Sequence, residues 1–317
     1  MRTRRDLPGG CAAEHTVRAS VAIQGPPSQR ESDDQLGIID GLDEAIMRAG
    51  NSSFSRYLAQ QAPEMLMSRF KVEPGSLVAN GLADHVKHGT TILATTFADG
   101  VIIAADRQVT SGSTVSSRYG EKIIPADNYS CIGTAGTAAL GVEIAKLFQV
   151  ELEHYEKIEG SPLSLAGKAN RLSKMIYENV GMAMQGLSVV PLFTGYDPET
   201  SEGKIFSYDA LGGRTEEYKY HSIGSGSIIA LGALKKLYAE NMSEEEALLV
   251  CIQSLYDASE EDIYTMGVDL TRDIFPIIYT TTASGNQLVP GERVGELMRG
   301  VIDGRMRTPD GPRALPR

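Results

Sequence analysis

The sequence predicts an α+β protein, a four-layer αββα sandwich, and three observations lead to this fold class. Residues 90–97 and 101–107 are apolar runs of strand length, and a short turn rich in Asp and Gly separates them. This pattern is typical of a hairpin of two buried strands. The later elements follow in the order strands, two helices, strands, two helices, strands. Because the strands are apolar on both sides, they need cover on both faces, which two packed sheets with helices outside provide.

The remaining elements are predicted from periodicity and from turn residues. Two strands, at residues 122–125 and 130–134, lead into a turn of small residues, and helices are expected over 138–158 and 163–187. The later expected elements are strands at 189–196, 204–209 and 215–222, helices at 227–240 and 243–259, a strand at 274–282 and a helix at 291–305. The helix at 243–259 begins with the string SEEE, a capping box that marks a helix start.

Composition changes sharply near residue 90 and divides the chain into three parts. Residues 1–50 mix Arg, Asp, Gly, Pro, Ser and Gln with little periodicity, and residues 71–89 have loop-like composition, so the leader, residues 1–89, is expected to be largely disordered. Residues 90–305 are expected to form one folded domain, and residues 306–317 a flexible tail. The leader also holds a local apolar group, made of Phe54, Tyr57, Leu58, Met65 and Leu66. Two interpretations of it stay open: a segment that docks on the maturing protein, or a passive cap.

Charge and cysteine content exclude several classes of partner. The 317 residues carry a formal net charge of -11, with a pI of about 5.0, so a nucleic-acid partner is not expected. Cys11, Cys131 and Cys251 form no metal-binding pattern, and neither a metal nor a cofactor is expected. No apolar run approaches the ~18–20 residues of a membrane helix. Together these features predict a cytoplasmic protein without a membrane partner.

The most informative string is HGTTILATTFADGVIIAADRQVTSGSTVSSRYGEKIIPADNYSCIGTAGTAAL, over residues 88–140. Further along the chain come VELEHYEKIEGSPL, MAMQGL, GYDP, IGSGS and DLTRDIFP, in that order. With these motifs the chain resembles the β-subunits of bacterial 20S proteasomes of the actinobacterial type, over nearly all of residues 90–305. That family consists of N-terminal nucleophile hydrolases of the threonine peptidase class. The resemblance implies a precursor whose leader, residues 1–89, is removed by self-cleavage between Gly89 and Thr90.

The chemistry at this junction agrees with the resemblance. A threonine hydroxyl is a weak nucleophile unless a base lies beside it. Once Thr90 is the first residue, its own α-amino group is that base, with an ordinary pKa of about 7.7–8.0. Before cleavage the same nitrogen belongs to an amide and takes no proton. Gly89 suits the attack by the Thr90 hydroxyl, because glycine has no Cβ and accepts unusual backbone angles.

The resemblance also implies roles for further residues. Asp106 corresponds to the aspartate that orients the catalytic lysine, and Lys122 to that lysine, whose charge keeps the Thr90 amine neutral. Gly136 corresponds to the glycine whose N–H stabilises the oxyanion. The resemblance assigns a supporting network near the terminal amine to Ser225, Asp262 and Thr265. The family usually has serine at the last position, so threonine there keeps the hydroxyl and adds a methyl group.

Substrate contacts are implied in the same way. Four residues correspond to positions that line the first specificity pocket or pair with an extended peptide: Val109, Thr110, Thr134 and Ala138. The small side chains at 134 and 138 predict room for a medium or large apolar substrate side chain. Pairing at Thr110 and Gly136 would bind the peptide main chain as an added strand.

The implied function is peptide-bond hydrolysis of unfolded or tagged proteins within a proteasome core particle. Its implied partners are α-subunit rings, other β-subunits in stacked heptameric rings (α7β7β7α7) and a regulatory ATPase ring. Two alternatives stay open: a non-catalytic structural ring subunit, and an HslV-like peptidase subunit. Chains of the HslV type also begin with TT but are shorter and lack a long leader, whereas the presence of Thr90, Asp106 and Lys122 argues against a structural subunit.

Overall fold

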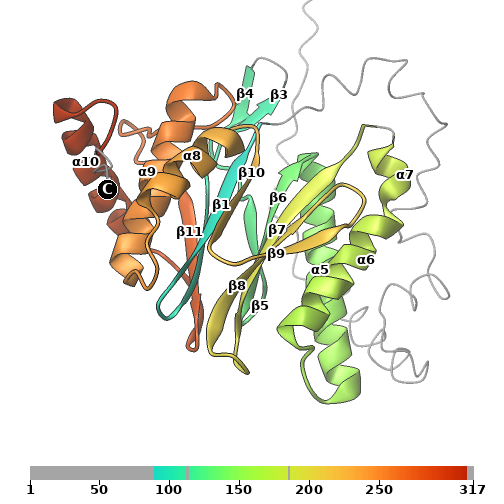
Figure 1. Ribbon diagram of the computed structural model, residues 1–317. Helices are drawn as coiled ribbons and strands as arrows, with labels where there is room; N and C mark the ends of the chain where they lie inside the picture. Colours follow the sequence, from blue (N-terminus) through green and yellow to red (C-terminus); the bar gives the residue numbers. More distant parts are fainter. Residues whose placement is uncertain (1–88, 112–113, 185, 313–317) are drawn as a thin grey trace, which may run out of the picture. The chain divides into compact units, whose positions relative to one another are not determined.

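A computed structural model describes residues 89–111, 114–184 and 186–312 of the chain. Two antiparallel five-stranded sheets lie face to face between two layers of helices, which confirms the predicted αββα sandwich (Figure 1). The leader up to residue 88, with its apolar group, lies outside the described residues, so its predicted disorder and removal stay predictions. None of the helices in the described ranges is both long and apolar enough to cross a membrane.

The strands come from segments far apart in the sequence. The first sheet has the order β10-β1-β2-β11-β12, made of Tyr220–Gly224, Thr91–Phe97, Gly100–Ala105, Ile277–Thr282 and Gly285–Leu288. The second sheet has the order β5-β6-β7-β8-β9, made of Ile123–Asp127, Ser130–Gly136, Val189–Asp197, Glu202–Tyr208 and Arg214–Glu217. A separate two-stranded ribbon pairs β3 (Val109–Ser111) with β4 (Thr114–Ser117).

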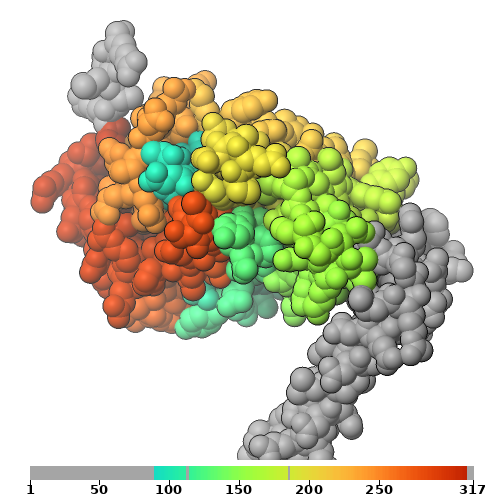
Figure 2. All heavy atoms as spheres, turned by 90° about the horizontal axis from the view of Figure 1, so that it is seen from below, coloured from blue at the N-terminus to red at the C-terminus, as the bar shows by residue number. Residues whose placement is uncertain are grey.

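The helices cover the outer faces of the two sheets. Over the second sheet lie α5 (Ala138–Glu159), α6 (Leu165–Glu178) and α7 (Val180–Ala183). Over the first sheet lie α8 (Ser227–Leu237), α9 (Glu244–Glu261) and α10 (Gly291–Arg307). Viewed from below, the orange-to-red part of the chain and the green part lie on opposite sides of this face (Figure 2). The predicted capping box is confirmed at the start of α9, where the Ser243 and Glu246 side chains each bond the other's backbone N–H.

Successive side chains on the central strands pack alternately into two different hydrophobic cores. This explains why these strands are apolar on both faces. In β2, Ile102 and Ala104 pack under the helices of the first sheet. Their neighbours Val101, Ile103 and Ala105 pack between the two sheets. This is the two-residue period of an extended strand. A third core lies between the second sheet and α5 and α6.

Two predicted elements are wrong in detail. The helix expected over 163–187 is interrupted at Asn179, whose side-chain amide donates to the Met175 carbonyl at 2.8 Å and thereby competes with the helical ladder. The strand expected over 215–222 is two strands, β9 and β10, which belong to different sheets. A continuous β-prone run carries no signal of such an exchange between sheets.

Two further differences concern a pair of strands that was not predicted and the end of the last helix. The ribbon of β3 and β4 is largely exposed and polar, so it lacks the apolar alternation by which a strand is recognised. The last helix continues to Arg307, so the segment 306–317 that was expected to be a tail begins inside α10. Just beyond the helix, the Pro309 carbonyl accepts a hydrogen bond from Arg305 at 3.2 Å.

Phe193 at the centre of the second sheet tests the packing of its core. Its ring is fully buried, edge-on to Phe148 and stacked on Phe206 with centroid distances of 5.7 and 6.1 Å. Phe193→Ala should lower the free energy of unfolding by about 3–5 kcal/mol, because it leaves a cavity among aromatic rings. Tyr177→Ala, at an exposed ring, should change it by less than about 0.5 kcal/mol. The measurement is urea unfolding followed by circular dichroism, and equal losses in both variants would contradict the packing.

Candidate active site

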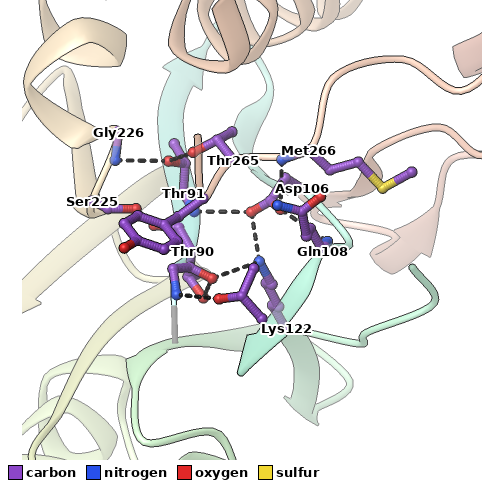
Figure 3. A network of polar contacts seen from close by, with 12 residues as sticks. Thr90, Thr91, Asp106, Gln108, Lys122, Ser225, Gly226, Thr265 and Met266 are labelled. Atoms are coloured by element: carbon purple, nitrogen blue, oxygen red, sulfur yellow. Dashed lines mark hydrogen bonds and ion pairs between the residues drawn. The ribbon is translucent and has the colours of Figure 1, made fainter. Parts of the chain in front are cut away.

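The predicted catalytic residues meet at one end of the sandwich. Thr90 directly precedes β1. Asp106 directly follows β2 and Ser225 directly follows β10, and β2 and β10 are the two strands that pair with β1. Lys122 directly precedes β5 and reaches the same point from the other sheet (Figure 3). Residues far apart in the chain therefore converge because strand ends of both sheets meet here.

The peptide bond between Gly89 and Thr90 lies directly on this cluster. The Thr90 hydroxyl oxygen is 2.8 Å from the Gly89 carbonyl oxygen, to which it donates, and Thr90 is almost fully buried. The Lys122 Nζ lies 3.4 Å from the same carbonyl oxygen. On the other side, the Gly89 N–H donates to the Thr110 hydroxyl at 3.2 Å. The junction predicted to be cleaved is thus held against the predicted nucleophile.

Asp106 is buried, and its carboxylate accepts four hydrogen bonds from the described residues. Oδ1 accepts from the Thr91 N–H at 2.9 Å and from Lys122 Nζ at 2.7 Å. Oδ2 accepts from the Gln108 N–H at 2.9 Å and from the Met266 N–H at 3.1 Å. A buried carboxylate is costly unless its oxygens are paired, and here both oxygens are. The predicted role of Asp106, orienting Lys122, agrees with this geometry.

Lys122 is buried together with its partner, and only 7% of its side chain is exposed. Burial lowers the pKa of Lys122 below its ordinary value, although the neighbouring Asp106 carboxylate opposes the shift. An ammonium group taken out of water loses hydration that one carboxylate only partly replaces. The lysine is therefore held in place by an ion pair and yet releases its proton more readily than a surface lysine does.

A second network links the hydroxyl groups behind the nucleophile. The Thr265 hydroxyl donates to Asp262 Oδ2 at 2.6 Å and lies 2.6 Å from the Thr91 hydroxyl. Because each hydroxyl has one proton, Thr91 must donate to Thr265, while its own oxygen accepts the Gly226 N–H at 3.1 Å. The result is a directed chain of hydrogen bonds that ends on the Asp262 carboxylate. Figure 3 shows its first part, from Gly226 through Thr91 to Thr265.

Ser225 joins this carboxylate to the backbone of the nucleophile. Its hydroxyl lies 2.5 Å from Asp262 Oδ2, and its N–H donates to the Thr90 carbonyl at 2.8 Å. The preceding Gly224 has a positive φ of 98°, and a Cβ on it would lie 1.8 Å from the Thr90 carbonyl oxygen. Glycine at position 224 therefore allows β10 to approach the nucleophile this closely.

Gly136 and three of the four predicted substrate contacts lie outside these networks. Among the described residues, no hydrogen bond joins Gly136, Val109, Thr134 or Ala138 to Gly89 or Thr90, and Thr110 alone of the substrate set hydrogen-bonds to the junction. Gly136 instead lines a cavity of about 700 Å³. The same cavity is lined by Gly224 and Ser225 beside the nucleophile, and its volume is in the range of ligand pockets.

Comparison with known proteins decides the family. A family model for proteasome subunits matches residues 86–269. A proteasome subunit beta from Streptomyces griseus is 50% identical over 275 residues, which cover 86% of this chain and 95% of the relative. The chain belongs to the proteasome subunit family. Proteasome beta subunits from Streptosporangium roseum (52% identical, 83% and 92% covered) and Acidothermus cellulolyticus (45%, 88% and 96%) are also similar.

The alignment with the Streptomyces griseus relative also covers residues of this proteasome subunit that precede Thr90. The 275 aligned residues of the Streptomyces griseus relative outnumber the residues from Thr90 to the end of the chain. Part of the segment before Thr90 is therefore shared with that relative. The resemblance predicted from the motifs is confirmed, including its actinobacterial character.

The described residues of this subunit include neither an activated cysteine nucleophile nor a cluster of side chains that could hold a metal ion. Burial raises the pKa of the Cys131 thiol to about 12, and it raises the pKa of Cys251 as well. Since the thiolate is the reactive form, neither buried cysteine is an activated nucleophile. No group of three or more His, Cys, Asp or Glu side chains that could hold a metal ion occurs within the described ranges.

Some residues of the network were missed by sequence reasoning. Thr91 supplies both a hydroxyl to the second network and an N–H to Asp106, and Gly226 and Met266 contribute backbone N–H groups. The doubled threonine after Gly89 was a signal for Thr91, because a second polar side chain at a buried strand start needs a partner. Backbone donors such as Met266 leave no signal in the sequence.

The hydroxyl of Thr265 is the central link of the second network. Thr265→Val should reduce peptide hydrolysis by about 10- to 100-fold, because leaving buried partners unpaired costs about 1–3 kcal/mol. Thr265→Ser keeps the hydroxyl and should stay within a few-fold of wild type. The exposed Thr271 hydroxyl, which bonds Asp269, provides a matched control, since Thr271→Val should leave the rate unchanged. Equal rates for Thr265→Val and Thr265→Ser would refute the role of the hydroxyl.

Proposed function

We propose that this chain is the catalytic β-subunit of a bacterial proteasome core particle, a threonine endopeptidase that activates itself by cleaving Gly89–Thr90. One observation carries the proposal: the buried Thr90 hydroxyl rests 2.8 Å from the carbonyl oxygen of the preceding residue, with the Lys122–Asp106 ion pair beside it. An isolated Gly-Thr pair in a loop has no need of a buried lysine and a fully paired carboxylate.

Self-cleavage follows from this placement. The Thr90 Oγ attacks the Gly89 carbonyl carbon and loses its proton to a base, and a tetrahedral intermediate forms. The bond from that carbon to the Thr90 nitrogen then breaks, the nitrogen takes up a proton, and the leader is left as an ester on the hydroxyl. Water hydrolyses the ester, which releases the leader with Gly89 as its terminal carboxylate and restores the hydroxyl of Thr90.

Lys122 is the base that the precursor offers for this step. The α-nitrogen of Thr90 is still an amide and cannot accept a proton, whereas the lowered pKa of Lys122 makes a neutral amine accessible. Its Nζ, 3.4 Å from the Gly89 carbonyl oxygen, also lies where negative charge develops.

In the processed subunit the free amine of Thr90 becomes the base for peptide hydrolysis. The attack on a substrate carbonyl then follows the same course, through an ester of the substrate on Thr90 and its hydrolysis by water. A cationic Lys122 disfavours a second positive charge on the nearby amine and so keeps it in the neutral form that accepts a proton. The Gly136 N–H is assigned to the oxyanion of this second reaction, at the wall of the cavity of about 700 Å³.

An extended polypeptide is the substrate class that fits this site. Thr110 holds the main-chain N–H of Gly89 in the precursor, and we assign it the corresponding contact with a substrate. Val109, Thr134 and Ala138 are assigned to the pocket for the substrate side chain before the cleaved bond. Because a folded domain cannot present an extended strand to a buried nucleophile, unfolded or tagged proteins are the proposed substrates.

The proposed setting is a cytoplasmic particle. Membership of the proteasome subunit family implies assembly with other subunits. We assign to this chain α-subunit rings, further β-subunits in stacked heptameric rings and a regulatory ATPase ring as partners. A structural ring subunit, the remaining alternative, would need no intact nucleophile, and the N-terminal sequence of the assembled particle separates the two: a catalytic subunit begins at Thr90.

Removal of the nucleophile tests the mechanism most directly. Thr90→Ala should leave the leader attached and abolish peptide hydrolysis, because the attacking oxygen is gone. Thr90→Ser should cleave at least in part, since the hydroxyl survives, though with greater rotational freedom. Intact-mass spectrometry of uniformly mutant particles measures cleavage, and a fluorogenic peptide measures hydrolysis. Normal turnover by Thr90→Ala particles would disprove the mechanism.

The pH profile of self-cleavage tests the role of Lys122. Because the neutral amine is the base and its pKa lies below the ordinary value, the cleavage rate should rise with pH through that lowered pKa and then level off. Lys122→Arg should lose both the rate and its rise, because a guanidinium stays protonated. First-order loss of precursor, followed by mass at several pH values, gives the profile. A wild-type rate independent of pH, or an active arginine variant, would show that another group is the base.

A further inference from the structure

Gly89 is in contact with a residue that has so far had no role, Tyr264. A Cβ added to Gly89 would lie 1.7 Å from the Tyr264 Cβ, 2.6 Å from its Cγ and 2.9 Å from its Cα. Real Cβ atoms do not come this close to another carbon, so Tyr264 fills the space that any side chain at position 89 would need. Gly89 is itself buried. Gly89, the residue before the bond proposed to be cleaved, therefore packs directly against Tyr264.

The backbone of Tyr264 is held in place, because its turn is tied to the catalytic network on both sides. Before it, the Gln108 side chain donates to the Ile263 carbonyl at 3.2 Å, and the Tyr264 N–H donates to Asp262 Oδ1 at 3.2 Å. After it come the Thr265 hydroxyl of the second network and the Met266 N–H on Asp106. The turn and the nucleophile are thus held by the same two carboxylates.

The remaining contacts of Gly89 show what the tyrosine adds. The Gly89 N–H is held by Thr110 and its carbonyl oxygen by Thr90 and Lys122. These bonds fix the polar atoms of Gly89, and none of them involves its Cα. Tyr264 provides an apolar contact on Gly89, at the Cα next to the carbon that is attacked. Fixing a reacting carbon within a fraction of an ångström of its attacker has a large effect on rate.

We propose that Tyr264 is a positioning residue for self-cleavage: its Cβ and ring hold Gly89 so that the carbonyl carbon stays within reach of the Thr90 hydroxyl. The inference rests on the proposed self-cleavage of Gly89–Thr90. Tyr264 acts through sterics, because its hydroxyl makes no hydrogen bond with any described residue. Since Gly89 departs with the leader, the role ends with processing, and peptide hydrolysis by the mature subunit does not depend on it.

Processing and hydrolysis can be measured separately on the full chain. Tyr264→Ala should slow self-cleavage by about tenfold to a hundredfold, because the ring contact is lost. Tyr264→Phe, which keeps the ring, should cleave within about twofold of wild type. After cleavage has run to completion, peptide hydrolysis per Thr90 terminus should be within about twofold of wild type in both variants. Ile263→Ala, at a neighbouring exposed side chain of the same turn, is the matched control and should change neither rate.

Two results would overturn the inference. If Tyr264→Ala cleaves at the wild-type rate, the contact has no positioning role. If cleavage and hydrolysis per Thr90 terminus fall together, Tyr264 supports the site as a whole and has no role specific to Gly89.

A pair of substitutions tests the contact itself. Gly89→Ala should slow cleavage by about a hundredfold or more, because its Cβ collides with Tyr264. Adding Tyr264→Gly removes the opposing Cβ and should recover about tenfold relative to Gly89→Ala alone, a coupling expected of residues in contact. Tyr264→Ala keeps that Cβ and should give no recovery. Recovery by both variants, or by neither, would refute the proposed contact.

Failure of the inference is distinguishable from failure of the proposed function. If the wild-type chain never yields a Thr90 terminus, or if the Thr90→Ala chain is still cut after Gly89 at the wild-type rate, self-cleavage itself is wrong. If the wild type cleaves through Thr90 and the Tyr264 variants behave like Ile263→Ala, the proposed function stands and the inference alone falls.

Discussion

The buried ion pair between Asp106 and Lys122 is the interaction on which the rest of the site depends. It joins the end of β2 in the first sheet to the start of β5 in the second, and it therefore ties the two sheets together beside the nucleophile. The same carboxylate accepts the N–H groups of Thr91 and Met266, so it also sets the start of β1 and the turn after α9. Removing a partner from such a buried pair is costly, because the charge left behind has neither water nor a counterion.

The features that make this pair stable also make it reactive. Four donors, Lys122 among them, pair with the carboxylate, and burial lowers the pKa of Lys122. A lysine in open solvent would keep its proton and would leave the precursor without a base. The second network contributes the Asp262 carboxylate, and it anchors the hydroxyl of Thr91 and, through Ser225, the backbone of Thr90.

A single geometry serves two reactions in succession in the proposed mechanism. In the precursor the carbonyl under attack belongs to the chain itself, so the substrate is already present and no affinity is needed to bind it. In the processed subunit the same hydroxyl meets a separate polypeptide, and the freed amine replaces the amide. Tyr264 belongs to the first reaction, whereas Gly136 and the cavity beside it belong to the second. The division follows from which atoms remain after the leader departs.

The sequence by itself determined most of the strand and helix order, the layered fold class and, through the motifs around Thr90, the family and most of the residues that meet at the candidate site. These follow from local patterns and from strings of residues that can be read along the chain. Only the tertiary structure decided that β9 and β10 enter different sheets, that Met266 and Gly226 lend their N–H groups to the site, and that Tyr264 lies against Gly89. Backbone donors and steric contacts depend on where distant segments meet in space. A single sequence does not reveal them, because almost any residue type can supply a backbone N–H or a contact.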